Sequence, residues 1–221
     1  MTQKFTILFD LDGTLIDTAP DLIRAHNHVM KKFGYPTKTL GELKNAVGRG
    51  AKAMMAKANG QWKWFDEKIQ NEMTNEFLSY YGENIFHESK LINGVKEFLN
   101  WCKQKNISMA VCTNKTEHLA VDLLKKIGIY DYFEYVAGYN TFEYCKPDPR
   151  HLTTIIEILD GDINKSIMIG DSETDANAAK AAEIPIILLK YGYTEKKSSE
   201  IYHNHLVKDF VGIEKIINEY L

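Results

Sequence analysis

Two carboxylates stand at the end of an apolar segment near the start of the chain, Asp10 and Asp12 in Asp10-Leu11-Asp12-Gly13-Thr14. The preceding run, Phe5-Thr6-Ile7-Leu8-Phe9, has the pattern of a buried strand. Asp is disfavoured in strands, and burying its charge is costly unless a partner compensates it. A divalent cation is such a partner, and carboxylate oxygens are ligands that Mg2+ accepts. The alternative for this motif alone is a strand that ends in an Asp-Gly turn.

Three later polar clusters have a similar relation to an apolar run or to the start of a helix. Thr113-Asn114-Lys115 follows the apolar run 109–112, and Gly170-Asp171-Ser172-Glu173-Thr174-Asp175 follows the run 167–169. Lys146 lies in a turn stiffened by proline, Lys146-Pro147-Asp148-Pro149. Ligands of open α/β sheets bind outside the carboxyl ends of the strands, so we predict that all four clusters converge on one site.

The motifs DLDGT, TN, KP and GDSETD, in this order, resemble those of the haloacid dehalogenase superfamily, whose phosphatases use an aspartate nucleophile. The resemblance extends over essentially the whole chain. It implies that Asp10 is the nucleophile and that Asp12 is the general acid and base. It also implies a Mg2+ site formed by Asp10, the backbone carbonyl of Asp12, and Asp171, with Asp175 in a supporting role. The presence of Asp12 argues against the dehalogenase branch, whose pattern lacks this second carboxylate.

The same resemblance assigns the other motif residues to the phosphoryl group. Lys146 would be a catalytic cation that holds the nucleophile and the phosphate together. The Thr113 hydroxyl and the Asn114 backbone N–H would bind phosphate oxygens at the start of a helix, and Gly13 would allow close approach of the backbone. The structural alternatives are helix capping for Thr113, Asn114, Asp171 and Ser172, and a solvated surface position for Lys146.

Substrate selection is expected to lie in the long helical stretch that follows the first strand. Gly48-Arg49-Gly50 with Lys52 is the candidate anion-binding loop, because glycines allow close approach and Arg49 can hold a carboxylate through two hydrogen bonds. This loop, Thr113-Asn114-Lys115 and the segment 17–22 resemble the corresponding parts of phosphoglycolate phosphatases. The alternative for the loop is a turn between helices with solvated cations.

Two features depart from the pattern of that subfamily. Asp148 and His151 stand where other residues are more usual, and the tract Gln61-Trp62-Lys63-Trp64-Phe65 is unusually aromatic. The Trp62-Trp64-Phe65 cluster is either core packing or a wall over the substrate. Fold does not settle function, so pyrophosphate, a sugar phosphate or a nucleoside monophosphate remain alternatives to phosphoglycolate. A phosphoglucomutase-like phosphotransferase and a non-catalytic binding module are the alternatives from other classes.

The elements that must position these residues alternate along the second part of the chain. Strands are predicted at residues 5–9, 108–112, 135–137, 166–169, 186–189 and 205–207. Helices are predicted between them at residues 94–104, 116–127, 150–159 and 174–182. A last helix is expected to be capped by Asp209 and to place Val211 on its apolar face. This alternation predicts a parallel sheet that is covered on both faces.

Between the first strand and this region the pattern is helical, with helices expected at residues 21–33, 40–47, 51–58 and 66–81. The predicted fold is therefore α/β, a doubly wound, Rossmann-like parallel-sheet core with an inserted all-helical cap domain. We expect the core to comprise residues 1–17 and 89–221, and the cap domain to comprise residues 18–88. Domain closure over the site would exclude water.

The overall composition limits the class of partner. The chain has 221 residues, of which 44% are hydrophobic, and a net charge of −3, which offers no footprint for nucleic acid or an anionic membrane. No apolar run approaches the roughly 18 residues of a membrane span, and no leader pattern is evident. The three cysteines form neither a zinc motif nor a disulfide framework. We expect a cytoplasmic enzyme that acts on a small phosphorylated metabolite, as a monomer or a dimer.

Overall fold

The computed structural model describes residues 4–47, 50–56, 66–194 and 196–221. Within these ranges, six strands form a central sheet in the order β5-β4-β1-β6-β7-β8, and every neighbouring pair is parallel. The strands are β1 (Thr6–Phe9), β4 (Ser108–Cys112), β5 (Tyr135–Ala137), β6 (Ser166–Gly170), β7 (Ile186–Leu189) and β8 (His205–Val207). Their bounds differ from the predicted ones by at most one residue.

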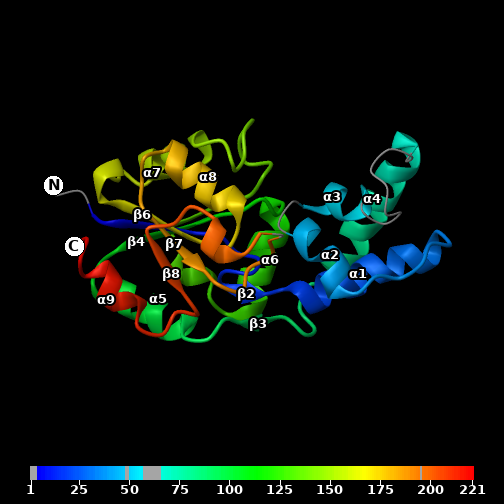
Figure 1. The fold of residues 1–221 in the computed structure, drawn as a ribbon, viewed down its shortest axis with the longest axis horizontal. Coiled ribbons are helices and arrows are strands. Elements are labelled where there is room, and N and C mark those ends of the chain that lie inside the picture. The colour runs from blue at the N-terminus through cyan, green and yellow to red at the C-terminus, as the bar shows by residue number, and fades with distance from the viewer. Residues whose placement is uncertain (1–3, 48–49, 57–65, 195) are drawn as a thin grey trace.

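Helices cover both faces of the sheet (Figure 1). One face carries α5 (Val95–Gln104), α6 (Glu117–Ile127) and α9 (Ile213–Ile217), and the other carries α7 (Arg150–Ile158) and α8 (Glu173–Ala181). The side chains of β1 alternate between the two cores, because Ile7 and Phe9 belong to the first and Leu8 belongs to the second. A strand buried on both faces needs an unbroken apolar run, which is what the sequence shows there. The predicted doubly wound parallel sheet is confirmed.

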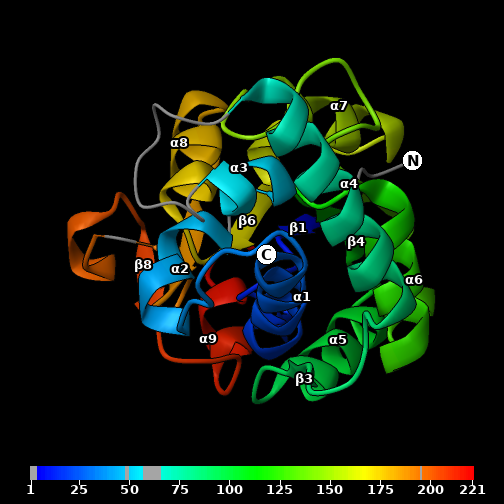
Figure 2. The same cartoon turned by 90° about the vertical axis from the view of Figure 1, so that its right-hand side faces the viewer.

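A helical insert lies beyond the carboxyl ends of the strands (Figure 1, Figure 2). It consists of α1 (Ala19–Lys32), α2 (Leu40–Val47), α3 (Ala51–Ala56) and α4 (Glu67–Glu83). Val29, Met73 and Phe77 are among the apolar side chains buried where α1 and α4 pack together. The expected end of α3 at residue 58 falls outside the described residues. None of the helices in the described part of the chain combines the length and apolarity needed to cross a bilayer.

Two short strands that were not predicted join the insert to the core. β2 (Ile16–Asp17) precedes α1 and pairs antiparallel with β3 (Lys90–Leu91), which follows α4. The buried Asp21 carboxylate in α1 accepts hydrogen bonds from the backbone N–H groups of residues 87, 88 and 89 and from the Ser89 hydroxyl at 2.6 Å. These contacts hold the outgoing and returning segments of the chain side by side.

The C-terminal helix differs from the prediction in its cap and in its apolar face. The N-cap of α9 is Gly212, which has a left-handed φ of 87°. Asp209 instead accepts a hydrogen bond from the Val211 N–H at 3.0 Å, in the turn before the helix. Val211 is 69% exposed, whereas Phe210 is buried. Phe210, rather than Val211, is therefore the residue of this turn that packs into the core.

Candidate active site

The four polar motifs meet at the carboxyl edge of three neighbouring strands. Asp10 follows β1, Thr113 follows β4 and Asp171 follows β6, and β1 lies between the other two strands. A cavity of about 380 Å3 lies there between the sheet and the insert. Its core side is lined by residues from all four motifs, Asp10, Asp12, Thr113, Asn114, Lys115, Lys146 and Asp175. The structure therefore brings together segments that are up to 165 positions apart in the sequence.

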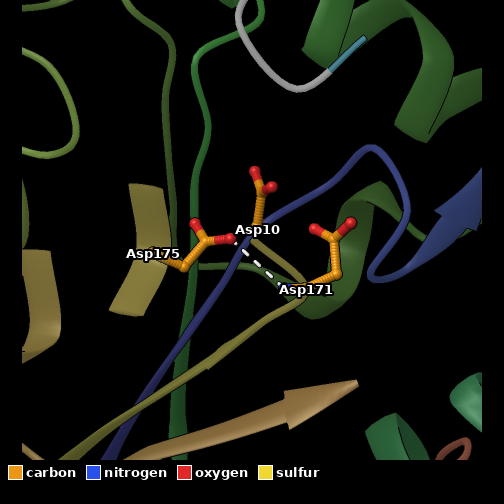
Figure 3. Close-up of side chains that lie close together, drawn as sticks. All are labelled: Asp10, Asp171 and Asp175. Atoms are coloured by element: carbon orange, nitrogen blue, oxygen red, sulfur yellow. Dashed lines mark hydrogen bonds between the residues drawn. The ribbon is translucent and has the colours of Figure 1, made fainter. Parts of the chain in front are cut away.

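Asp10, Asp171 and Asp175 form a buried cluster of carboxylates. One oxygen of each lies within 4.8 Å of the corresponding oxygens of the other two. Figure 3 shows the three side chains side by side, Asp10 from the end of β1, Asp171 from the turn after β6 and Asp175 from the first turn of α8. The spacing of four residues brings the carboxylates of Asp171 and Asp175 to the same cluster. Buried carboxylate oxygens that lie this close together are suited to be ligands of a hard divalent cation.

Asp171 is held by two donors from distant parts of the chain. The Thr14 hydroxyl donates to Asp171 Oδ1 at 3.1 Å, and the Tyr193 backbone N–H donates to Asp171 Oδ2 at 2.7 Å. Gly192 packs so closely that a Cβ there would lie 2.5 Å from Asp171 Cβ and Oδ2, and closer still to its carbonyl oxygen. The segment after β7 therefore forms one side of the site. Sequence analysis did not assign this segment a role.

Of Asp171 and Ser172, the two residues for which helix capping was the alternative role, Ser172 is the N-cap of α8. Ser172 and Asp175 form a capping box at the start of α8. Asp175 Oδ2 accepts from the Ser172 hydroxyl at 2.6 Å and from the backbone N–H groups of Asp171 and Ser172 at 3.2 and 3.0 Å. Asp175 Oδ1 instead faces Lys146 Nζ at 2.6 Å. Asp175 thus serves as a cap with one oxygen and as a member of the acidic cluster with the other.

Lys146 is a buried cation beside the acidic cluster, rather than the solvated lysine of the structural alternative. It is 3% exposed, and its Nζ lies 2.9 Å from Asp10 Oδ1. Burial raises the pKa of Asp10 to about 6. The positive charge of Lys146 acts to lower this pKa, and the negative charge of Asp175 acts to raise it. Burial and the like charges of Asp175 and Asp10 also raise the pKa of Asp171. Lys146 pairs with Asp10 and Asp175, so the cluster of three carboxylates is balanced by this ammonium only in part, and the surplus negative charge fits a divalent cation such as Mg2+.

The turn that carries Lys146 is held from two sides. Asn114 Nδ2 donates to the Lys146 carbonyl at 2.8 Å, and the Lys146 backbone N–H donates to His151 Nδ1 at 3.1 Å. Burial, together with the charge of Lys146, lowers the pKa of His151 to about 4, so the imidazole is neutral at pH 7 and can accept this bond. His151 therefore positions Lys146. The other departure from the subfamily pattern, Asp148, forms an ion pair with Arg150 away from the cavity at 2.6 Å.

Asp12 is paired with a cation to which sequence analysis assigned no role. Lys115 Nζ lies 3.0 and 3.1 Å from the two carboxylate oxygens of Asp12 and 2.9 Å from the Tyr81 hydroxyl in α4. The same ammonium lies 4.5 Å from the centre of the Tyr81 ring, and Lys115 is 8% exposed. This contact joins the first motif to the insert. The sequence placed Lys115 in the Thr113-Asn114-Lys115 cluster, but it did not indicate that Lys115 pairs with Asp12.

Thr113 and Gly13 are placed by contacts within the core. Thr113 Oγ1 accepts a hydrogen bond from the Lys115 N–H at 3.2 Å, whereas the N-cap residue of α6 is Thr116. Gly13 has a φ of 83°, and a Cβ there would lie 2.5 Å from Asp171 Oδ2. Glycine is therefore required at position 13 by the packing of Asp171. The expected contacts of Thr113, Asn114 and Gly13 with phosphate remain predictions.

The insert forms the other wall of the cavity. Gly50 and Lys52 line it, and Arg49 and the Trp62-Trp64-Phe65 cluster lie outside the described residues. Most of the other lining side chains from the insert are apolar, among them Leu22, Val47, Met54, Phe77 and Leu78. These apolar side chains exclude water from their part of the cavity, and Lys52 is the charged side chain of this wall among the described residues.

Tyr193 connects Asp171 with the segment that leads into the insert. While its backbone N–H holds Asp171, its hydroxyl donates to Asp17 Oδ1 at 2.6 Å and accepts from the Ala19 N–H at 3.0 Å. Asp17 and Ala19 flank the start of α1. Tyr193 therefore links the acidic cluster to the base of the insert, a connection that has no local signal in the sequence.

Comparisons with known proteins reveal relatives that align with nearly the whole chain. The sequence profile of the haloacid dehalogenase-like hydrolases matches residues 7–189. A phosphoglycolate phosphatase from Agrobacterium fabrum is 38% identical over 215 residues, which cover 97% of this chain and 92% of that protein. A phosphoglycolate phosphatase from Mesorhizobium japonicum is 36% identical over 92% of this chain and 90% of its own length. The crystal structure of a predicted phosphoglycolate phosphatase from Haemophilus somnus has a TM-score of 0.90 at 29% identity, covering 98% of this chain and 99% of its own.

Proposed function

Because this chain belongs to the haloacid dehalogenase-like hydrolases and is a phosphoric monoester hydrolase of that family, we propose that it hydrolyses 2-phosphoglycolate through an aspartyl-phosphate, with Mg2+ as cofactor. The observation that carries the chemistry is the buried cluster of Asp10, Asp171 and Asp175 beside Lys146. The likeness to phosphoglycolate phosphatases over nearly the full length supports the choice of substrate.

Asp10 is the proposed nucleophile. One of its carboxylate oxygens forms a bond to phosphorus while the bond from phosphorus to the ester oxygen breaks. The ammonium of Lys146, 2.9 Å from this carboxylate, favours its ionised form against the effect of burial. Asp10, the backbone carbonyl of Asp12, and Asp171 would hold the metal, with Asp175 supporting them. Bound Mg2+ supplies positive charge that offsets the repulsion between the carboxylate and the phosphoryl oxygens.

Asp12 is the proposed general acid and base. It lines the cavity two residues after the nucleophile, where it can give a proton to the leaving alkoxide. The resulting carboxylate then accepts a proton from the water that attacks the aspartyl-phosphate. This second displacement releases inorganic phosphate and regenerates Asp10. Two inversions at phosphorus through one covalent intermediate replace a single difficult step.

Thr113, the backbone N–H of Asn114 and Gly13 are proposed to bind the phosphoryl oxygens, together with Lys146. The Thr113 oxygen accepts the Lys115 N–H, which leaves its hydroxyl hydrogen available for a phosphate oxygen. The 11-residue helix α6 begins shortly after this motif, and the positive end of its dipole favours an anion.

We propose that residues 18–88 act as a cap domain and that Arg49, Gly50 and Lys52 select the substrate from that side. Gly50 and Lys52 line the cavity opposite the motifs of the core. Closure of the insert would complete the site and remove water from the leaving group. Phosphoglycolate carries a carboxylate, which an Arg-Gly loop can bind through the guanidinium and the backbone.

Phosphate release from a panel of phosphorylated metabolites with Mg2+ tests this proposal. The panel holds 2-phosphoglycolate, pyrophosphate, hexose phosphates and nucleoside monophosphates. A strong preference for 2-phosphoglycolate is the expected result, whereas preference for another member would refute the proposed substrate. A requirement for a bisphosphate activator would reveal a phosphoglucomutase-like transferase, and an absence of metal-dependent turnover would refute the chemistry. Arg49→Ala should lower kcat/KM for 2-phosphoglycolate more than for an aryl phosphate, and equal losses would place Arg49 outside substrate selection.

A further inference from the structure

Lys115 stands out among the cations that line the cavity. Within the described residues, the lining contains Lys52, Lys115 and Lys146. Lys146 is engaged by Asp10 and Asp175, and Lys52 is an exposed residue of the insert. Lys115 is buried and contacts the residue proposed to protonate the leaving group. Its ammonium therefore lies on the side of the cavity that receives the alcohol part of a phosphomonoester.

We propose that Lys115 is a specificity-determining residue that binds an acidic group on the leaving side of the substrate. In the free enzyme its partner is the Asp12 carboxylate, and a carboxylate of the bound substrate takes over part of this contact. The class of substrate that this favours is a small phosphomonoester with an acidic group one or two carbons from the ester oxygen. The inference deepens the proposed function and rests on it, since it takes the roles of Asp10 and Asp12 from there.

The positions of the Asp10 and Asp12 carboxylates determine where the leaving group of the substrate must lie. In a phosphoryl transfer the attacking and leaving oxygens are roughly in line, so the ester oxygen points away from Asp10. General acid catalysis requires that this oxygen lie within hydrogen-bond reach of Asp12. Lys115 Nζ is 3.0 Å from Asp12 Oδ1 and therefore within two hydrogen-bond lengths, about 6 Å, of the ester oxygen. A carboxylate attached one carbon away falls within this interval.

A second observation beside Lys115 also points to an anionic ligand. Thr116 lines the same cavity, and its buried hydroxyl has no hydrogen-bond partner among the described residues. A buried hydroxyl without a partner is costly, and a carboxylate oxygen is an acceptor that would satisfy it. Lys115 and Thr116 are adjacent in the chain at the start of α6. Together they offer a charge and a hydroxyl to one carboxylate.

Much of the rest of the cavity lining is apolar. Leu22, Phe77 and Leu119 line the cavity and cannot pair a carboxylate. The Tyr81 hydroxyl accepts a hydrogen bond from Lys115 Nζ at 2.9 Å and orients the ammonium from the insert. Although burial opposes it, the pKa of Lys115 is raised by Asp12 and Tyr81, so the side chain is charged at neutral pH. A leaving group that itself carries an ammonium would be repelled.

The test compares two substrates that differ only in the acidic group. These are 2-phosphoglycolate and 2-hydroxyethyl phosphate, which has an alkyl ester oxygen of similar leaving ability and no carboxylate. The measured quantity is the ratio of kcat/KM for the first to kcat/KM for the second. Because both substrates need the general acid, an effect of Lys115 exerted only through Asp12 cancels in this ratio.

Lys115→Met and Lys115→Gln are expected to lower the ratio by roughly 10- to 100-fold, the scale of one charge-assisted contact. Lys115→Arg should retain most of the wild-type ratio, and Thr116→Val should lower the ratio by a smaller factor. Lys115→Gln keeps a hydrogen-bond donor for Asp12 and so remains informative if the methionine variant fails to fold. The matched control is Lys126→Met, which removes an exposed lysine paired with Asp122 on the same helix and should leave the ratio unchanged.

The outcomes separate this inference from the proposed substrate. A wild-type ratio at or below one would refute 2-phosphoglycolate as the preferred substrate. The change in the ratio on substitution still decides the role of Lys115, since the lysine favours the anionic leaving group whatever the absolute rates. A ratio that is the same in wild type, Lys115→Met and Lys115→Gln overturns the inference and leaves Lys115 as a partner of Asp12 alone.

Discussion

Replacing Gly192 by alanine is expected to weaken the proposed Mg2+ site without changing any of its ligands. The segment after β7 lies against Asp171, and a Cβ at position 192 would be 2.5 Å from Asp171 Cβ and Oδ2 and closer still to its carbonyl oxygen. Ordinary van der Waals contact begins at 3.4 Å. Because the nearest atom belongs to the main chain of Asp171, rotation of a side chain cannot relieve the overlap. The loop and Asp171 must move apart.

The size of the effect follows from what that movement disturbs. Mg2+ requires oxygen ligands at about 2.0–2.1 Å in near-octahedral geometry, so a displaced carboxylate is lost as a ligand. The movement also disturbs the hydrogen bond from the Tyr193 N–H, which orients Asp171 at 2.7 Å. Loss of such an orienting partner costs roughly 10- to 100-fold in metal affinity, and overpacking costs about 1–3 kcal/mol of stability. We expect the Mg2+ concentration for half-maximal activity to rise by roughly 10- to 100-fold in Gly192→Ala.

The assay is phosphate release as a function of Mg2+ concentration, accompanied by the Mg2+ dependence of the melting temperature. The control is Gly41→Ala in α2, where a Cβ would meet only Thr39 Oγ1 at 4.0 Å, and its Mg2+ dependence should match the wild type. Wild-type values of both quantities in a folded Gly192→Ala protein would refute the reasoning. They would show that Asp171 does not hold the metal or that its position does not depend on this loop.

Three other perturbations address the nucleophile, the metal and the support of Lys146. Asp10→Asn should lower kcat by roughly 1,000-fold or more while the melting curve stays cooperative, and ordinary activity would rule out Asp10 as the nucleophile. Exhaustive chelation should abolish activity and added Mg2+ should restore it, whereas full activity after chelation is incompatible with the proposed mechanism. The pKa of His151 falls from 6.5 to about 4 on folding, so the unfolded chain binds the proton first as the pH drops. The wild type should therefore lose up to about 3 kcal/mol of stability relative to His151→Gln between pH 7 and pH 4. Urea melts at the two pH values measure this difference, and parallel losses in both proteins would contradict it.

Much of the fold could be predicted because its signals are local. The unbroken apolar run at residues 6–9 predicts a strand with two buried faces, and Ile7, Leu8 and Phe9 do enter the two cores. The helix predicted at residues 116–127 ends where expected, at Gly128, which has a left-handed φ of 79°. The predicted convergence of the motifs at the carboxyl edge is seen in the cluster of Asp10, Asp171 and Asp175. Each of these features depends on neighbours within a few residues, or on one strand position in a parallel sheet.

The predictions that were wrong or missing concern features that depend on packing between distant parts of the chain. Asp209 has the chemistry of a helix cap, yet the turn at Gly212 moved the start of α9 beyond its reach. The two-residue strands β2 and β3 are too short to show periodicity, and they pair because both ends of the insert return to the same place. A local sequence pattern indicates which contacts a residue is able to make. Which of these contacts forms depends on residues that are distant in the sequence.

The parallel sheet, the helical insert and the motif side chains at the carboxyl edge follow from local patterns in the amino-acid sequence. How those side chains are held depends on the tertiary structure. It paired Lys115 with both Asp12 and Tyr81, set Tyr193 between Asp171 and Asp17, and placed His151 behind Lys146. Each of the first two contacts links the core to the insert or to its base, across tens of residues. Their energies arise from burial and charge pairing, which exist only once the two parts of the chain have packed together.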